Sequence, residues 1–283
     1  MANYLLTQAG VLDSFNSDFV DLDDLRQVLN HLKGHCLRQL EMGLGRATDT
    51  WAANHDFLLE KLPSLRSLPV LSEKRYPDFL ARKSIEEYWL IDPLDGKSEF
   101  DARIPEFCIS IALIEGSRPV FSSLLVPSSK VTYWAEEAVG AFHEREGQAL
   151  ATIELPEAVG PKSRGLINRS PSGFDYASIY KSIGIEAHIP MGSSTKFSAL
   201  IENQADIYYC KGGSREWNVA AADLLLREAG GDLLCLDTGG SLYYNQETSE
   251  VAPFVATAPS QLLSQGEFQT LKRASVESLQ DHL

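Results

Sequence analysis

The sequence is poor in cysteine, and the few cysteines it has form no pairing motif. They lie far apart, at Cys36, Cys108, Cys210 and Cys235, with no Cys-x-x-Cys and no paired histidines beside them. This spacing argues against a zinc site and against a disulfide framework, because both need recognisable groups of ligands or partners. Isolated cysteines are typical of a reducing compartment, so we expect a cytoplasmic protein.

Basic residues and long apolar runs are also scarce. The chain has 25 Lys and Arg against 39 Asp and Glu, which gives a formal net charge of −14. A protein that binds a nucleic-acid polymer needs a basic surface to displace counterions from phosphates, so this class of partner is not expected. No stretch reaches the roughly 18 apolar residues of a membrane span, so no membrane is expected as a partner. A small anion bound through a metal or a local group of cations remains compatible with this charge.

The first half of the chain predicts helices followed by strands. Hydrophobic residues make up 44% of the 283 residues, enough for a sizeable core. Apolar residues recur at helical spacing from Leu22 to Leu44, and a second helical stretch from Trp51 to Leu62 is expected to end at Pro63. Strand-like segments follow at 68–71, 88–91, 107–114 and 119–125.

The second half alternates helical and strand-like segments. Residues 154–172 are rich in Pro, Gly, Ser and Lys and predict a boundary between two halves. We therefore expect an N-terminal α+β half at 1–157, carrying a metal site, and a C-terminal α/β half at 158–283, carrying substrate contacts. Predicted helices lie at 176–183, 193–203 and 217–229, and predicted strands lie at 185–189, 232–236 and 254–257. The pattern is that of layered, mixed α and β structure.

An acidic run follows one of the predicted strands. The segment Tyr88-Trp89-Leu90-Ile91-Asp92-Pro93-Leu94-Asp95-Gly96 is an apolar strand that ends in two carboxylates three residues apart. A Pro/Gly-constrained turn would hold both carboxylates together, an arrangement that suits hard divalent cations. The alternative is an ordinary acidic turn, since Asp, Pro and Gly are common turn residues.

Other segments accompany this run in order and spacing. Pro69-Val70-Leu71-Ser72-Glu73 precedes it, Gly192-Ser193-Ser194-Thr195-Lys196 follows it, and Glu216-Trp217-Asn218 begins a helix that ends at Gly230-Gly231. From Pro69 to Pro259 this constellation resembles the inositol-monophosphatase-like phosphatases, most closely their bacterial 3′(2′),5′-bisphosphate nucleotidase branch. The resemblance implies a layered αβαβα sandwich of mixed α+β content. By itself, Ser193 to Lys196 is a small-residue turn followed by a cation, which suits phosphate.

The resemblance also implies a reaction and its residues. Members of the family hydrolyse phosphomonoesters with Mg²⁺ ions that polarise the phosphoryl group and activate water. The implied metal ligands are Glu73, Asp92, Asp95, the Leu94 carbonyl and Asn218. The implied catalytic residues are Asp92, Asp95, Lys97 and Asp49, and the implied substrate contacts are Gly96, Lys97, Ser98, Ser193, Lys196 and Asn218.

Several positions depart from the family pattern. Lys97 and Trp51 stand where the family has the Thr and Asp that together orient and deprotonate water, with Asp49 as a displaced substitute for that Asp. Asn218 replaces a ligand Asp, which removes a formal charge. Lys74 replaces a second Glu, and Pro171 replaces a His. The Lys97 ammonium is a candidate to take the place of one metal ion, so the number of Mg²⁺ ions is expected to be reduced.

Three hypotheses follow for the function. The first is a Mg²⁺-dependent phosphatase acting on a 3′-phosphorylated adenine nucleotide or a similar small phosphate. The second is a pseudo-phosphatase that binds such a ligand or a protein partner without turnover, and the third is the same pocket repurposed for another transfer on an anionic molecule. The expected partner is a small phosphorylated or sulfated nucleotide or sugar, with a protein partner as the alternative in the second hypothesis. The resemblance implies a monomer or a homodimer.

Overall fold

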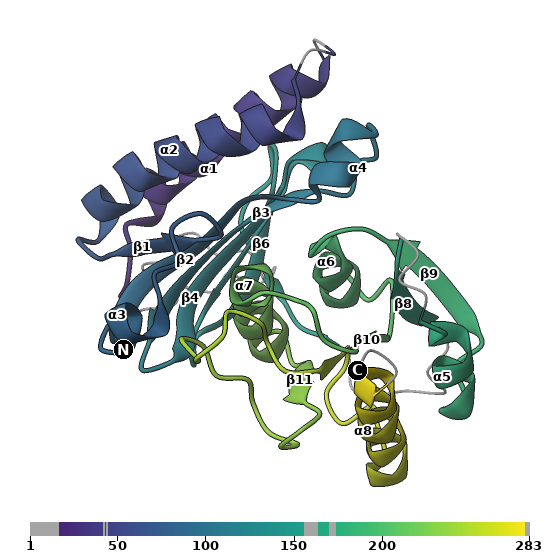
Figure 1. Ribbon diagram of the computed structural model, residues 1–283. Coiled ribbons are helices and arrows are strands. Elements are labelled where there is room, and N and C mark those ends of the chain that lie inside the picture. The colour runs from purple at the N-terminus through teal and green to yellow at the C-terminus, as the bar shows by residue number, and fades with distance from the viewer. Residues whose placement is uncertain (1–16, 42, 44, 156–163, 170–173, 281–283) are drawn as a thin grey trace.

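Two β-sheets form the framework of the protein (Figure 1). The structure is a computed structural model that describes residues 17–41, 43, 45–155, 164–169 and 174–280. Within these residues the larger sheet has seven strands, in the order β1-β2-β3-β4-β5-β6-β7. β1 and β2 run parallel, and each later pair of neighbours is antiparallel. The strands are β1 (Val70–Ser72), β2 (Glu87–Asp95), β3 (Cys108–Glu115), β4 (Arg118–Val126), β5 (Val131–Glu136), β6 (Gly140–Arg145) and β7 (Ala151–Ile153).

The second sheet has five strands within the described residues, in the order β11-β12-β10-β8-β9. β9, β8 and β10 run parallel to one another, while β12 is antiparallel to both β10 and β11. The strands are β8 (Arg164–Asn168), β9 (Ala187–Met191), β10 (Ile207–Cys210), β11 (Asp232–Cys235) and β12 (Phe254–Thr257).

Helices complete five layers, so the expected αβαβα sandwich is confirmed (Figure 1). α1 (Leu22–Glu41) and α2 (Ala47–Leu65) cover one face of the larger sheet. α6 (Thr195–Ile201) and α7 (Glu216–Glu228) lie between the sheets. α5 (Tyr176–Ser182) and α8 (Gln265–Gln280) pack on the far face of the smaller sheet. Short helical turns lie at α3 (Phe79–Arg82), α4 (Lys97–Asp101) and η1 (Pro127–Ser129).

Strand β2 shows how the sequence supplies both faces of the larger sheet. Successive side chains of a strand point to opposite faces. Tyr88 and Leu90 join the core that contains α7, whereas Trp89 and Ile91 join the core under α1 and α2. A strand buried on both faces reads as a continuous apolar run, which is how this segment reads.

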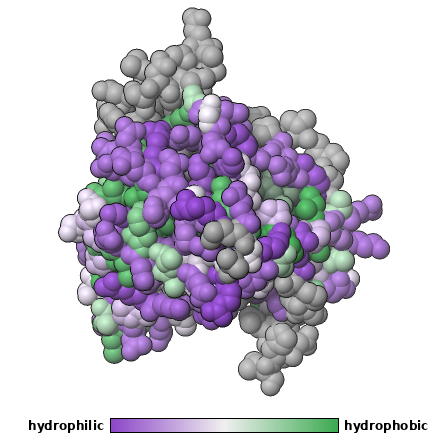
Figure 2. All heavy atoms as spheres, turned by 90° about the horizontal axis from the view of Figure 1, so that it is seen from above, coloured by the Kyte–Doolittle hydropathy of each residue, from purple (hydrophilic) through white to green (hydrophobic). Residues whose placement is uncertain are grey.

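The outer surface of the molecule is mostly polar in the view of Figure 2, where apolar residues form small separate patches. Leu25, Leu29 and Leu32 of α1 are buried, so this helix turns its apolar stripe inward. Among the described helices, none combines the length and the apolar character that a membrane crossing requires.

Two local expectations were wrong. α2 does not end at Pro63 but continues to Leu65, because a proline in the last turn removes one hydrogen bond without preventing a final turn. β2 does not leave the sheet at Asp92, since Asp95 still pairs with Cys108. Strand β8 lies within the segment 154–172 and pairs with β9 and β10. The division into halves near residue 157 remains a prediction, and residues 156–163 lie outside the described residues.

Candidate functional site

A β-bulge at the end of β2 positions the acidic run. The register between β2 and β3 shifts between Asp92 and Asp95, at the point where Pro93 has no N–H to donate to the ladder. Gly96 then takes a left-handed conformation with φ of 91°, and a Cβ there would lie 2.6 Å from the carbonyl oxygen of Glu106. Glycine is therefore required for the chain to turn from β2 into α4.

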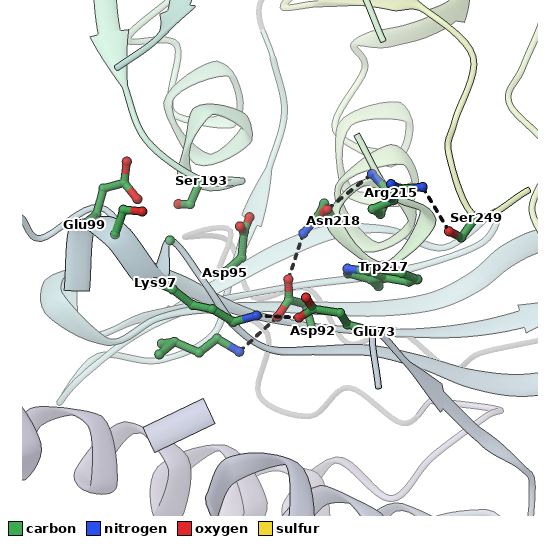
Figure 3. A pocket seen from close by; sticks show the side chains of 13 residues that line it. Glu73, Asp92, Asp95, Lys97, Glu99, Ser193, Arg215, Trp217, Asn218 and Ser249 are labelled. Carbon is green, nitrogen blue, oxygen red and sulfur yellow. Dashed lines mark hydrogen bonds and ion pairs between the residues drawn. The ribbon is translucent and has the colours of Figure 1, made fainter. Parts of the chain in front are cut away.

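Asp92 and Asp95 both line a pocket with a volume of about 580 Å³. Figure 3 shows side chains from β2, α4, α7 and the approach to α6 converging on this space. The pocket is lined by Glu73, Asp92, Leu94, Asp95, Gly96, Lys97, Ser98, Glu99, Ser193, Arg215, Trp217, Asn218 and Ser249.

Asp92 lies at the base of the pocket and is 3% exposed. The Asn218 side-chain amide donates to its Oδ2 at 2.7 Å, and the Leu94 backbone N–H donates to its Oδ1 at 3.1 Å (Figure 3). Burial raises the pKa of Asp92 well above its usual range, and the negative charge of Asp95 adds to the shift. Burial therefore disfavours the ionised form of Asp92, and a cation bound nearby would stabilise that form.

Asp95 is held by the segment that precedes α6. The backbone N–H and the hydroxyl of Ser194 both approach Asp95 Oδ2, at 2.6 Å and 2.5 Å. The same hydroxyl lies 2.7 Å from the Asn218 carbonyl oxygen, so Ser194 joins the end of β2 to α7. These contacts fix one carboxylate oxygen of Asp95.

Lys97 brings a cation into the pocket. As the first residue of α4, it forms an ion pair with Glu73, which follows β1 (Figure 3). The Lys97 Nζ lies 5.1 Å from the ring centroid of Trp51, a buried residue of α2, and Lys74 Nζ lies 4.6 Å from the same ring. Two ammonium groups therefore share one indole at the edge of the acidic pocket.

The pocket suits a divalent cation only in part. Its oxygen-rich lining has the donor chemistry that Mg²⁺ prefers. However, Glu73, Asp92 and Asp95 each already have a partner in Lys97, Asn218 and Ser194. In the described part of the chain, no three or more His, Cys, Asp or Glu side chains are grouped as a metal site requires. The pocket thus has oxygen donors for a cation, but each of these three carboxylates already has a partner within the protein.

A second cavity, of about 230 Å³, adjoins the first and shares Asp95, Ser193 and Asn218 with it. The Lys196 side chain lines this cavity, donates to the Ser193 carbonyl oxygen at 2.7 Å and lies 5.1 Å from the Tyr208 ring centroid. Burial lowers the pKa of Lys196, although the negative charge of Asp95 opposes this shift. The second cavity thus places a buried amine and an aromatic ring next to the acidic pocket.

Most of the predicted site residues meet at these two cavities, but Asp49 does not. Its side chain is 61% exposed and forms an ion pair with Arg46. It is absent from the lining of the acidic pocket, whereas Trp51 packs beneath Lys97. Pro171 lies outside the described residues.

Sequence reasoning missed four residues of the acidic pocket. Arg215, Trp217, Glu99 and Ser249 all contribute to the lining, and the Arg215 guanidinium lies 3.3 Å from the Ser249 hydroxyl. Trp217 is a core residue, 8% exposed, and one part of it also forms the pocket wall. Arg215 could have been predicted as a pocket residue, because it directly precedes the Glu-Trp-Asn motif. Ser249 could not, because it lies in a distant loop without a motif.

The protein is a layered αβαβα sandwich with an acidic pocket at the end of strand β2, which lies beside the edge strand β1. A model of the inositol monophosphatase family matches residues 31–274. The chain therefore belongs to the inositol monophosphatase family, as its sequence motifs had indicated.

Individual relatives place the chain near one branch of this family. The 3′(2′),5′-bisphosphate nucleotidase CysQ of Salmonella typhimurium is 35% identical over 179 residues, which are 63% of this chain and 71% of the relative. The protein of the same name from Aggregatibacter actinomycetemcomitans is 32% identical over 212 residues, covering 70% of this chain and 74% of the relative.

Solved structures agree with this placement. CysQ from Bacteroides thetaiotaomicron superposes with a TM-score of 0.69 and 27% identity, over 80% of this chain and 93% of that structure. Inositol monophosphatase II from Staphylococcus aureus has a TM-score of 0.73 over 92% of this chain and 97% of its own, but its 18% identity supports the fold alone. The chain is thus CysQ-like within a family of phosphoric monoester hydrolases.

Proposed function

We propose that the protein is a Mg²⁺-dependent phosphatase that hydrolyses a phosphomonoester of a small nucleotide-like molecule in the cytoplasm. The observation that carries the proposal is the pair Asp92 and Asp95, held at a bulge and facing a pocket. Four carboxylates line this pocket against the two cations Lys97 and Arg215. A phosphate dianion would be repelled by such a lining unless a further cation is bound, and this requirement favours metal dependence.

Asp92, Asp95 and the Leu94 carbonyl are the oxygen donors that would hold Mg²⁺, whereas the carboxylate of Glu73 is already paired with Lys97. The ion, when bound, would supply the positive charge that polarises the phosphoryl group and lowers the pKa of water. Asn218 offers an amide in place of a carboxylate, and its amide nitrogen faces Asp92. We therefore expect weaker metal binding than four carboxylates would give.

The remaining lining residues would bind and orient the substrate. Lys97 and Arg215 are the cations available to the phosphate, with Gly96 and Ser98 beside them. The second cavity, with Lys196 and an aromatic wall, would accept the nucleoside-like part of the molecule. Hydrolysis breaks the P–O ester bond as the oxygen of water bonds to phosphorus, and the alcohol leaves with one of the protons from water.

The site has few groups that could activate the attacking water. Trp51 stands beneath Lys97, and Asp49 is turned outward in its ion pair with Arg46. The described lining therefore lacks a Thr and Asp pair that would orient water and take its proton. Because general-base catalysis typically contributes about 10²–10⁴-fold, we expect slow turnover.

The test is the release of inorganic phosphate from adenosine 3′,5′-bisphosphate and from inositol monophosphate, with and without Mg²⁺. The proposal predicts slow, Mg²⁺-stimulated release from the nucleotide that is abolished by Asp92→Asn. Ser198→Ala is a matched control, because the Ser198 hydroxyl donates to the Thr195 carbonyl within the same helix and does not line the acidic pocket. Release that is absent in the wild type but present in a Lys97→Thr, Asn218→Asp double variant would overturn the proposal.

A second candidate is a protein that binds the same ligand without turnover. The specific observation in its favour is the contact of Lys97 with the Trp51 ring, because these two residues stand where the family pattern has the water-activating Thr and Asp. This candidate predicts that the nucleotide raises the unfolding temperature of the wild type although no phosphate is released. The third hypothesis, another transfer reaction in the same pocket, predicts consumption of the nucleotide without equivalent phosphate release.

A further inference from the structure

The Lys97–Glu73 ion pair is placed where it contributes little to stability. The Lys97 side chain is 36% exposed and the Glu73 side chain is 42% exposed. Exposed ion pairs are screened by water and lose side-chain freedom when they form, so most of them stabilise a fold only marginally. The principal effect of this pair is therefore on the charge inside the pocket, beside Asp92 and Asp95.

Trp51 fixes where the Lys97 ammonium can lie. The indole is 2% exposed and stacks on His55 of the same helix at 4.7 Å between ring centroids, so its position is set by the core. An ammonium over an indole face gains a cation–π contact that adds to its ion pair with a carboxylate. Between the indole and Glu73, the Lys97 ammonium has a defined position rather than the freedom of a surface lysine.

We propose that the Lys97 ammonium is a resident cation that occupies the Glu73 part of the acidic pocket and excludes one divalent ion from it. Glu73 supplies the carboxylate, and Trp51 supplies the face on which the lysine rests. Lysine is a compact point charge with three N–H donors, so it can neutralise a carboxylate and face a phosphate oxygen. The ammonium neutralises the charge of Glu73 and repels a second cation beside it, so the metal is favoured on the Asp92 and Asp95 side.

The inference deepens the proposed function by setting how many ions the site holds, and it is tested without turnover. Terbium(III) binds oxygen ligands as Ca²⁺ and Mg²⁺ do, and its luminescence is excited by tryptophan only at short range. Trp217 lines the pocket and Trp51 lies under Lys97, so ions in the pocket are reported selectively. A failure of phosphate release would leave this measurement unaffected.

The experiment compares ion binding by the wild type and by Lys97→Thr. We expect Lys97→Thr to bind terbium about three- to tenfold more tightly, the size expected from removing one partly exposed positive charge, and to bind one more ion per chain. Lys74→Thr is the matched control, because Lys74 shares the Trp51 face while Lys97 makes the ion pair with Glu73. Lys97→Arg keeps the charge and is expected to behave like the wild type.

A double variant assigns the additional ion to Glu73. Lys97→Thr combined with Glu73→Gln is expected to return the ion count to that of the wild type. The proposal would be overturned if Lys97→Thr bound ions as the wild type does, if Lys74→Thr had the same effect, or if the additional ion persisted in the double variant. Circular dichroism checks that each variant is folded, and Lys97→Met replaces Lys97→Thr if threonine disturbs α4.

Discussion

Replacing Asn218 with Asp is the most specific change that can be made to this pocket. It exchanges the side-chain amide for a carboxylate of the same shape and adds one negative charge. Asn218 Nδ2 donates to Asp92 Oδ2 at 2.7 Å, and Asp92 is 3% exposed. The Asn218→Asp variant would place a second carboxylate against a buried one. It would also remove one of the two hydrogen bonds that Asp92 accepts, leaving the one from the Leu94 backbone N–H.

The size of the effect follows from elementary electrostatics. Two unit charges ~4 Å apart repel by about 4 kcal/mol at an effective dielectric constant of about 20. Uptake of a proton by the pair limits this cost, because a protonated carboxyl group carries no charge. We therefore expect Asn218→Asp to lose ~2–4 kcal/mol of unfolding free energy at neutral pH without divalent ions.

The loss should depend on pH and on metal. The folded pair binds a proton that the unfolded chain releases near its ordinary pKa, so stability falls as pH rises through the raised pKa of the pair. Burial already raises the pKa of Asp92 in the same direction in the wild type. Mg²⁺ should restore stability by binding the folded state, by about 2.7 kcal/mol at a concentration 100 times its dissociation constant.

Urea unfolding at acidic and at slightly alkaline pH, with and without Mg²⁺, measures these quantities. Asn218→Ala is the control, because it loses the hydrogen bond without adding a charge and should gain nothing from Mg²⁺ relative to the wild type. The reasoning is refuted if Asn218→Asp is as stable as the wild type in a metal chelator, or if Mg²⁺ leaves its stability unchanged.

Two further predictions concern the supports of the acidic run, and both are read from urea unfolding. Ser194→Ala removes the hydroxyl that lies 2.5 Å from Asp95 and should lower the free energy of unfolding by about 1.5–3 kcal/mol. The control variant Ser198→Ala should lower it clearly less. Equal losses would contradict the assigned role of Ser194. Gly96→Ala should lower the free energy of unfolding by about 1–3 kcal/mol, because φ is 91° at this position and a Cβ would lie 2.6 Å from the Glu106 carbonyl oxygen. An unchanged free energy of unfolding would contradict this backbone geometry.

Elements with strong local signals were predictable from the sequence. The apolar run Phe254–Thr257 forms β12 at its expected bounds. The helix expected at 217–229 forms as α7 (Glu216–Glu228), because a dense apolar pattern is followed by Gly230 and Gly231. Both elements carry their determinants within a few residues.

Strand β8 shows why other elements were not predictable. Arg164–Asn168 lies in a segment whose Pro, Gly and Ser content indicates a loop. It is a strand because Leu166 pairs with Ile189 of β9 and with Tyr208 of β10, which lie well downstream in the chain. Tertiary pairing of this kind overrides local composition.

The same distinction holds for the candidate site. Asp92 and Asp95 were identifiable because a single short segment carries both of them. The contact of Ser194 with Asp95 joins residues 99 positions apart, so no spacing in the sequence reports it. The ion pair of Lys97 with Glu73 likewise depends on how the ends of β1 and β2 meet in the parallel pair.

The most direct test of the central claim, metal-dependent hydrolysis of a phosphomonoester, is turnover of adenosine 3′,5′-bisphosphate in isotopically labelled water. Mass spectrometry of the released phosphate reports whether the oxygen of water became bonded to phosphorus. The account predicts one labelled oxygen per phosphate released in the presence of Mg²⁺, and no release after chelation. Complete absence of labelled phosphate with Mg²⁺ present, while the nucleotide still protects the protein against unfolding, would contradict it.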